Sequence, residues 1–210
     1  MSQQSIYHKQ TIEFATVAKE YCAFIEGVQQ FEKANFLDKS LKLLPLLYLK
    51  ASMLPTTEFM LDEPIEQYVT EELYEYLRAL IAATMGQDDT YLEVFTQDMQ
   101  YSDTPLQENV SEGMTDIYQD LRDFISVYSM GYDKTMNEAL ARLIENFKNY
   151  WGQKLLNALR QLHFARYNNQ NEDEQDNYAQ HAQKDNWLFE GQKQHDTDSE
   201  DAEEWNKWGE

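Results

Sequence analysis

Two pairs of acidic side chains have the spacing that a divalent cation site requires. Glu72 and Glu75 are three residues apart, as are Asp120 and Asp123, and Asp116 lies one helical turn before the second pair. Residues three or four apart share one face of a helix, so each pair could present two carboxylates to the same ion. Carboxylate oxygens suit a hard cation such as Mg²⁺. The spacing therefore indicates a magnesium site as one alternative.

The segment Glu71-Glu72-Leu-Tyr-Glu75 resembles the E-x-x-E element of the all-α nucleoside triphosphate pyrophosphatases. That family pairs this element with E-x-x-D on the following helix and holds Mg²⁺ against the phosphates of the substrate. The resemblance implies a metal-binding role for Glu72, Glu75, Asp120 and Asp123. The second pair begins with Asp120 where the family has Glu, and the two pairs lie farther apart than usual. The structural alternative is that the acids after Thr70 mark a helix start, where they interact favourably with the helix dipole.

Other catalytic patterns are absent from the sequence. Di-iron bundles use Glu-x-x-His, but the residues three before the four histidines are Ser5, Arg160, Tyr178 and Gln192. Cys22 has no second cysteine to pair with and lies between apolar positions, so a buried thiol is expected. There is no Gly-rich phosphate loop, nucleophile elbow or Cys-x-x-Cys motif. Outside the magnesium alternative, we therefore expect no catalytic residue, no metal site and no cofactor.

The composition of the chain changes near Tyr167. Residues 168–210 contain 13 acidic residues, 3 lysines and no Val or Ile, yet they hold three of the four tryptophans. So few aliphatic side chains cannot order a segment by themselves, and a disordered or loosely docked tail is expected. We therefore divide the chain into a helical domain, 1–167, and an acidic tail, 168–210.

The tryptophans give the tail two candidate contact segments. Trp187, Leu188 and Phe189 are predicted to fold back onto the bundle as an intramolecular strap. Trp205 and Trp208, with Glu203 and Glu204 beside them, are predicted to bind a partner protein that has a basic surface. Tryptophans commonly act as the anchors of protein interfaces. Simple disorder of the whole tail is the remaining alternative.

The formal net charge of −21 restricts the partners. The tail contributes 3 − 13 = −10 and the body 14 − 25 = −11. Nucleic-acid binding needs clustered Lys and Arg, and anionic membranes repel an acidic surface, so neither partner is expected. The most apolar run, Leu41–Leu49, is too short to span a bilayer and the N-terminus has no signal-peptide pattern. With a single cysteine, these features predict a cytoplasmic protein of undefined oligomeric state.

Apolar residues recur at helical spacing through the body. Long helices are expected at about 11–31, 36–54, 65–85, 103–130 and 133–166. Pro45 should kink the second helix or begin a new one, and Gly86 should end the third. Thr90-Tyr-Leu-Glu93 has the capping-box pattern and predicts a short helix to about Met99. Five long helices with short connections predict an all-α, antiparallel bundle.

The stretch Leu43-Leu-Pro-Leu-Leu-Tyr-Leu-Lys-Ala-Ser-Met-Leu-Pro55 resembles the signature of a bacterial family classed as a domain of unknown function. The resemblance covers about residues 10–165. It implies an all-helical bacterial protein of the cytoplasm and supplies no catalytic residue.

Together, these observations favour a non-enzymatic bundle that contacts an unidentified protein partner through its acidic, tryptophan-bearing tail. The alternatives are the magnesium-dependent pyrophosphatase and an acidic mimic of nucleic acid that regulates a nucleic-acid enzyme. The mimic requires regularly spaced carboxylates on the surface of the body.

Overall fold

The computed structural model describes residues 5–61, 66–93 and 106–168. Within these ranges the main elements are α2 (Lys9–Glu26), α3 (Lys33–Ser52), α4 (Glu71–Met85), β1 (Thr90–Glu93), β2 (Leu106–Asn109), α5 (Val110–Tyr128), α6 (Asp133–Asn146) and α7 (Gly152–Tyr167). A π-helical turn, η4 (Phe147–Trp151), joins α6 to α7 without a break. The expected all-α antiparallel bundle is confirmed. None of the described helices is both long and apolar enough to cross a membrane.

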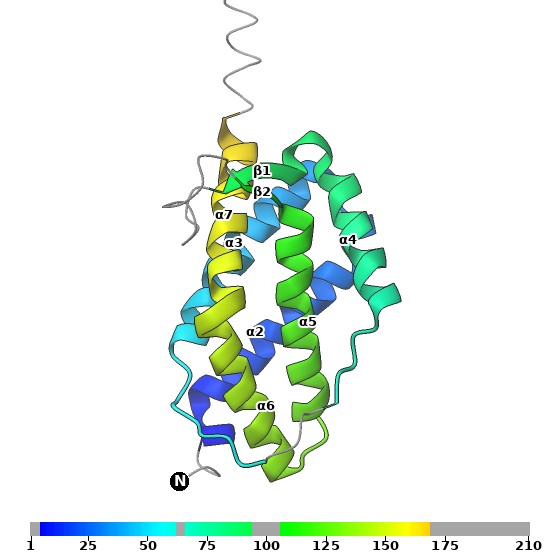
Figure 1. Ribbon diagram of the computed structural model, residues 1–210. Helices are drawn as coiled ribbons and strands as arrows, with labels where there is room; N and C mark the ends of the chain where they lie inside the picture. Colours follow the sequence, from blue (N-terminus) through cyan, green and yellow to red (C-terminus); the bar gives the residue numbers. More distant parts are fainter. Residues whose placement is uncertain (1–4, 62–65, 94–105, 169–210) are drawn as a thin grey trace, which may run out of the picture. The chain divides into compact units, whose positions relative to one another are not determined.

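Helix α5 makes the most extensive contacts with other helices in the described part of the bundle. It contacts α2, α4 and α6, and Figure 1 shows it running beside the α6–α7 column. Its predicted apolar stripe is confirmed, because Val110, Met114, Ile117, Leu121 and Phe124 are all buried. The stripes expected on the other helices also face the core, where their fully buried members include Phe14, Tyr21, Val28, Leu44, Ile81, Leu140, Trp151, Leu155, Ala158 and Leu162.

Helix α3 runs through Pro45 from Lys33 to Ser52 as one element, so the alternative that a new helix begins at the proline is wrong. The predicted end of the third helix is confirmed. Gly86 caps α4 with φ +61°, a conformation that glycine adopts without the steric cost of a Cβ atom.

The π-helical turn places Trp151 in the core and requires a glycine after it. The Trp151 side chain is fully buried, and its ring centroid lies 4.7 Å from that of Phe147. A Cβ atom at Gly152 would lie 2.3 Å from the carbonyl oxygen of Phe147 and 3.0 Å from its ring. The widened turn is therefore compatible with glycine at this position and with no other residue unless the backbone moves.

One buried carboxylate joins three segments of the bundle. Asp116 of α5 accepts hydrogen bonds from the hydroxyls of Tyr74 (2.7 Å) and Tyr150 (2.8 Å). Its Oδ2 also lies 2.6 Å from Nζ of Lys154. Only 8% of Asp116 is exposed, so its charge depends on these three donors for solvation. The contact links α4, α5 and the η4–α7 segment.

The capping-box prediction at Thr90 is wrong. Thr90–Glu93 forms strand β1, which pairs antiparallel with β2 so that Thr90 faces Asn109. The Thr90 hydroxyl donates across the strand pair to Oδ1 of Asn109 at 3.2 Å and therefore caps no helix. Residues 94–99, the rest of the expected helix, lie outside the described residues.

Two helix starts were placed too early. Helix α5 begins at Val110, after β2, because Asp89 accepts hydrogen bonds from both the amide and the hydroxyl of Ser111 (2.7 Å each). Helix α4 begins at Glu71, where the Thr70 hydroxyl accepts from the amide of Leu73 at 3.3 Å. This position confirms the structural alternative for the acids that follow Thr70.

We predict that Gly152→Ala destabilises the protein by about 2–3 kcal/mol, because the added methyl group overlaps Phe147. Gly113→Ala is the matched control, since its Cβ would meet only ordinary contacts at 3.8 and 3.9 Å inside α5. That control should gain about 0.5–1 kcal/mol from helix propensity. Urea unfolding of both variants checks the prediction, and equal effects would contradict it.

We predict that Asp116→Asn destabilises the protein by about 2–3 kcal/mol, because it leaves Lys154 with a weaker partner in a site that is only partly open to solvent. Glu112 at 3.6 Å is the remaining carboxylate beside that lysine. Adding Lys154→Met to the same chain should restore part of the loss. A double-mutant cycle by urea unfolding measures the coupling, and strictly additive effects would show that the pair is not coupled.

Candidate functional site

An irregular connector between α3 and α4 crosses the end of the bundle and is held there by a buried acid of α6. Glu138, only 1% exposed, accepts hydrogen bonds from the amides of Met60 (2.8 Å) and Leu61 (3.0 Å). The neighbouring Asn137 donates to the carbonyl oxygen of Glu58 at 2.8 Å. Buried backbone groups outside regular structure require such partners. The connector is therefore fixed to the surface of α6 at this point.

A second acid holds the far end of the connector. Oδ1 of Asp123 on α5 accepts from the amides of Tyr68 (2.7 Å) and Val69 (3.1 Å), directly before α4 begins. Burial raises the pKa of Asp123, and the two backbone donors oppose that shift. Asp123 therefore sets the position from which α4 starts.

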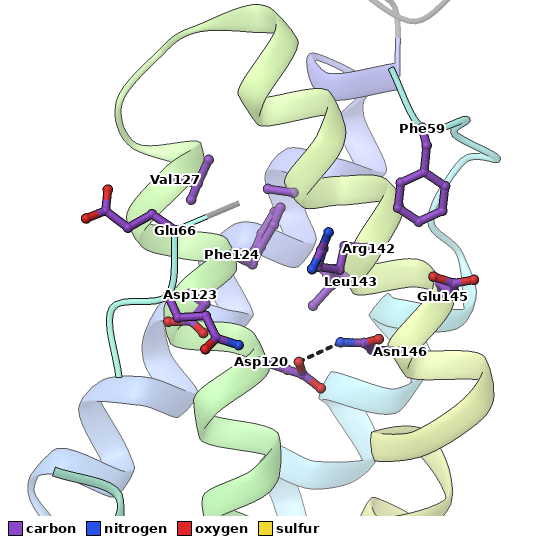
Figure 2. A pocket seen from close by; sticks show the side chains of 12 residues that line it. Phe59, Glu66, Asp120, Asp123, Phe124, Val127, Arg142, Leu143, Glu145 and Asn146 are labelled. Atoms are coloured by element: carbon purple, nitrogen blue, oxygen red, sulfur yellow. Dashed lines mark hydrogen bonds between the residues drawn. The ribbon is translucent and has the colours of Figure 1, made fainter. Parts of the chain in front are cut away.

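A pocket lies between α5, α6 and the described connector residues Phe59, Glu66 and Gln67 (Figure 2). Its volume is about 280 Å³. The described residues that line it are Phe59, Glu66, Gln67, Asp120, Asp123, Phe124, Val127, Ala139, Arg142, Leu143, Glu145 and Asn146. The wall thus combines apolar side chains with four carboxylates and one guanidinium. A polar pocket with an apolar wall is the usual form of a small-molecule site.

Asp120 is the most perturbed carboxyl group of the pocket. Burial raises its pKa to about 6, assisted by the charges of Asp123 and Asp116, although a hydrogen bond from Asn146 lowers it. That bond joins Nδ2 of Asn146 to Oδ1 of Asp120 at 2.8 Å and is drawn in Figure 2. No described residue donates a hydrogen bond to the second carboxylate oxygen, Oδ2. Asp120 can therefore accept a further donor from inside the pocket.

Arg142 is the one cation among the described lining residues. Its Nε is buried without a hydrogen-bond partner, and no ion pair joins its guanidinium to another described residue. A buried guanidinium N–H without an acceptor is costly. In Figure 2 the side chain lies between Phe124 and Phe59 within the pocket. Arg142 as a whole is half-buried and Nε is its enclosed atom, so a ligand in the pocket would have to reach the guanidinium through its terminal nitrogens.

The four carboxylates of the magnesium alternative are not brought together. Asp120 and Asp123 line the pocket, whereas Glu72 and Glu75 are exposed on α4 and do not. Glu75 pairs with Arg78 at 2.6 Å, and hydrogen bonds from its own backbone amide and from the Thr70 hydroxyl lower the pKa of Glu72. Among the described residues no group of three or more His, Cys, Asp or Glu side chains could hold a metal ion.

The other predicted residues give a mixed outcome. Cys22 is buried as expected, and burial raises the pKa of its thiol to about 12, so it is not a nucleophile at neutral pH. The predicted strap, Trp187, Leu188 and Phe189, lies outside the described residues. So do the predicted partner-binding residues Trp205, Trp208, Glu203 and Glu204.

Sequence reasoning missed Arg142, Asn146 and the connector residues Phe59 and Glu66. In the sequence Arg142 is an isolated positive charge that belongs to no basic cluster. Its significance depends on contacts between α5, α6 and the connector, which are far apart along the chain. The available signal was a charged side chain between the apolar stripe positions Leu140 and Ile144.

We predict that the stability of the wild-type protein falls relative to Asp120→Asn as the pH rises from about 4 to about 7. The folded-state pKa of Asp120 is raised from 3.8 to about 6, so the protonated native form is favoured at low pH. The contribution of protonated Asp120 to the free energy of unfolding is fully present below about pH 4 and is lost as the pH passes through about 6. The variant should gain about 1–2 kcal/mol relative to wild type over this range, allowing for partial exposure.

Urea unfolding at several pH values measures the difference. Asp38→Asn is the control, because the hydrogen bond from Lys42 lowers the pKa of Asp38 and the sign should reverse. A difference between wild type and Asp120→Asn that does not change with pH would contradict the prediction.

Comparisons with known proteins agree with the helical resemblance seen in the sequence. A family model described as a domain of unknown function, DUF5063, matches residues 5–168. The crystal structure of protein BF1032 from Bacteroides fragilis is 47% identical, with a TM-score of 0.70, and the match covers 78% of this chain and 96% of that one. No protein of curated function matches significantly. With a family match over most of its length and the same helical architecture, the chain belongs to the DUF5063 family.

Proposed function

We propose that the protein is a non-enzymatic, cytoplasmic interaction module that binds a protein partner through its acidic C-terminal segment. The observation that carries the proposal is the pairing of Trp205 and Trp208 with dense acidic charge in residues 168–210. An exposed tryptophan is a poor use of a large apolar side chain unless it enters a pocket. Glu203, Glu204 and the neighbouring acids favour a partner whose pocket has a basic rim.

The family match supports a division of roles between the body and the C-terminal segment. It ends at residue 168, so all three tail tryptophans lie beyond the region matched by the family model. The described body buries its own tryptophan, Trp151, completely. The core of the described body is thus completed by Trp151, inside the region that the family model matches.

The roles of the body's carboxylates also support a non-enzymatic function. Asp123 fixes the connector, Asp116 accepts from two tyrosines and a lysine, and Glu75 pairs with Arg78. Each of these acids has a structural partner, and the described residues offer no cluster suited to a metal ion. Two of the four acids proposed for the pyrophosphatase alternative, Glu75 and Asp123, thus have structural partners.

The test compares the full-length wild-type protein with Trp205→Ala/Trp208→Ala. We expect the double variant to lose its captured partner by about 30-fold or more in affinity, because anchor tryptophans commonly contribute 2 kcal/mol or more. Affinity capture followed by direct titration of the purified partner measures the loss. Unchanged capture would contradict the proposal.

Two further variants separate the contributions of position and charge. Trp187→Ala, in the predicted strap, is the matched control and should retain the partner. Glu203→Gln/Glu204→Gln should weaken binding mainly at low ionic strength, because rim charges act over about one Debye length. Equal losses in Trp187→Ala and the terminal double variant would assign binding to the whole segment rather than to its end.

A further inference from the structure

The pocket between α5, α6 and the connector contains complementary charges that do not neutralise each other. The buried Nε of Arg142 has no acceptor, and the structure forms no ion pair between this guanidinium and Asp120, Asp123, Glu66 or Glu145. Arginine binds carboxylates with particular specificity, because its planar group can donate two parallel hydrogen bonds. An external carboxylate is therefore the simplest acceptor for this side chain.

The net charge of the pocket argues against a simple anion. One guanidinium is opposed by the four carboxyl groups of Glu66, Asp120, Asp123 and Glu145, which gives 1 − 4 = −3 when all are ionised. A phosphate or a dicarboxylate would add negative charge to a site whose described lining already has a surplus of it. A ligand with both a carboxylate and an ammonium group would satisfy Arg142 and offset the surplus negative charge.

Asp120 is placed to receive that ammonium group. Its Oδ1 is occupied by Asn146, which fixes the orientation of the carboxyl group and leaves Oδ2 as the acceptor. Burial makes the ionised form of Asp120 unfavourable, because the carboxylate loses part of its hydration. A nearby ammonium group would stabilise that ionised form. Asp123 already accepts hydrogen bonds from two backbone amides, so it is less available than Asp120 to bind the ammonium group.

The remaining wall is apolar and the space is small. Phe59, Phe124, Val127 and Leu143 line the pocket beside Arg142 (Figure 2). The volume of about 280 Å³ lies near the lower end of the range for ligand pockets. These two properties suit a single apolar side chain carried by a small zwitterion.

We propose that this pocket binds a free α-amino acid with an apolar side chain, with its carboxylate on Arg142 and its ammonium group on Asp120. The bound molecule would bridge α5 and α6 and give the terminal nitrogens of the Arg142 guanidinium a carboxylate partner. This inference concerns the body alone and is independent of the proposed tail interaction.

Calorimetric titration of the full-length protein with L-leucine, L-phenylalanine, N-acetyl-L-leucine and L-leucinamide tests the proposal. At least one of the two free amino acids should bind with a Kd of about 1 mM or tighter. N-acetylation removes the positive charge and amidation removes the negative charge, so each change should weaken binding about tenfold or more. Equal binding of the acetylated compound would overturn the proposal, as would no binding of any compound at about 10 mM.

Variants of the two anchoring residues assign the groups of the ligand. Arg142→Lys keeps the positive charge but loses the paired donors, and should weaken the free amino acid more than L-leucinamide. Asp120→Asn should weaken the free amino acid more than N-acetyl-L-leucine. Arg78→Lys on exposed α4 is the matched control and should leave binding unchanged.

A measurement on the wild-type protein keeps the test independent of variant stability. Methyl resonances of Val127, Ala139 and Leu143 should shift on titration, because these groups line the pocket. Shifts confined to other methyl groups would place the ligand elsewhere and overturn the assignment. Loss of the tail interaction in Trp205→Ala/Trp208→Ala should leave these shifts unchanged, so the two proposals fail separately.

Discussion

The arrangement of this bundle depends on hydrogen-bond acceptors for the backbone amides of the irregular connector between α3 and α4. The connector from α3 to α4 crosses α6 and α5, and its amides at Met60, Leu61, Tyr68 and Val69 bond to only two carboxylates. Buried amides without acceptors would cost about 1–3 kcal/mol each. Glu138 and Asp123 remove that cost, and in doing so they determine where α4 begins and where the described connector residues lie against α5 and α6.

The same use of acidic side chains recurs throughout the described body. Asp89 accepts hydrogen bonds from Ser111 at the start of α5. Asp116 accepts hydrogen bonds from two tyrosine hydroxyls and pairs with a lysine. Asp120 accepts a hydrogen bond from Asn146. Not all of the acidic residues behind the body's net charge of −11 serve as a solvated surface, because several of their carboxylates accept hydrogen bonds inside the fold. The protonation state of these carboxylates therefore affects how strongly the fold is held. A carboxylate accepts from amides and hydroxyls more strongly than a neutral acid does.

Local patterns in the sequence predicted the helices well and the connections poorly. The stripes of α2 and α5 are visible because helical packing repeats every three or four residues, and Phe14 and Met114 are buried accordingly. Thr90 has the pattern of a helix cap, but pairing with the distant Asn109 decides its structure. The roles of Glu138 and Arg142 depend on contacts made across the fold, which no spacing rule reports. Gly152 is the one local sign of the π-helical turn in the sequence. A glycine inside a long helix is unfavourable unless close packing requires it.

The pocket lies inside the region that the family model matches, and the tail tryptophans lie beyond it. The two proposals can therefore be assessed separately. Every described residue of the pocket lies between Phe59 and Asn146, inside the region matched by the family model, whereas Trp205 and Trp208 lie beyond residue 168. A relative that shares only the body can therefore share the pocket but not the terminal anchors. The solved structure from Bacteroides fragilis is matched over 96% of its length by 78% of this chain. Ligand binding by a relative that shares only the body would support the pocket independently of the partner proposed for the tail.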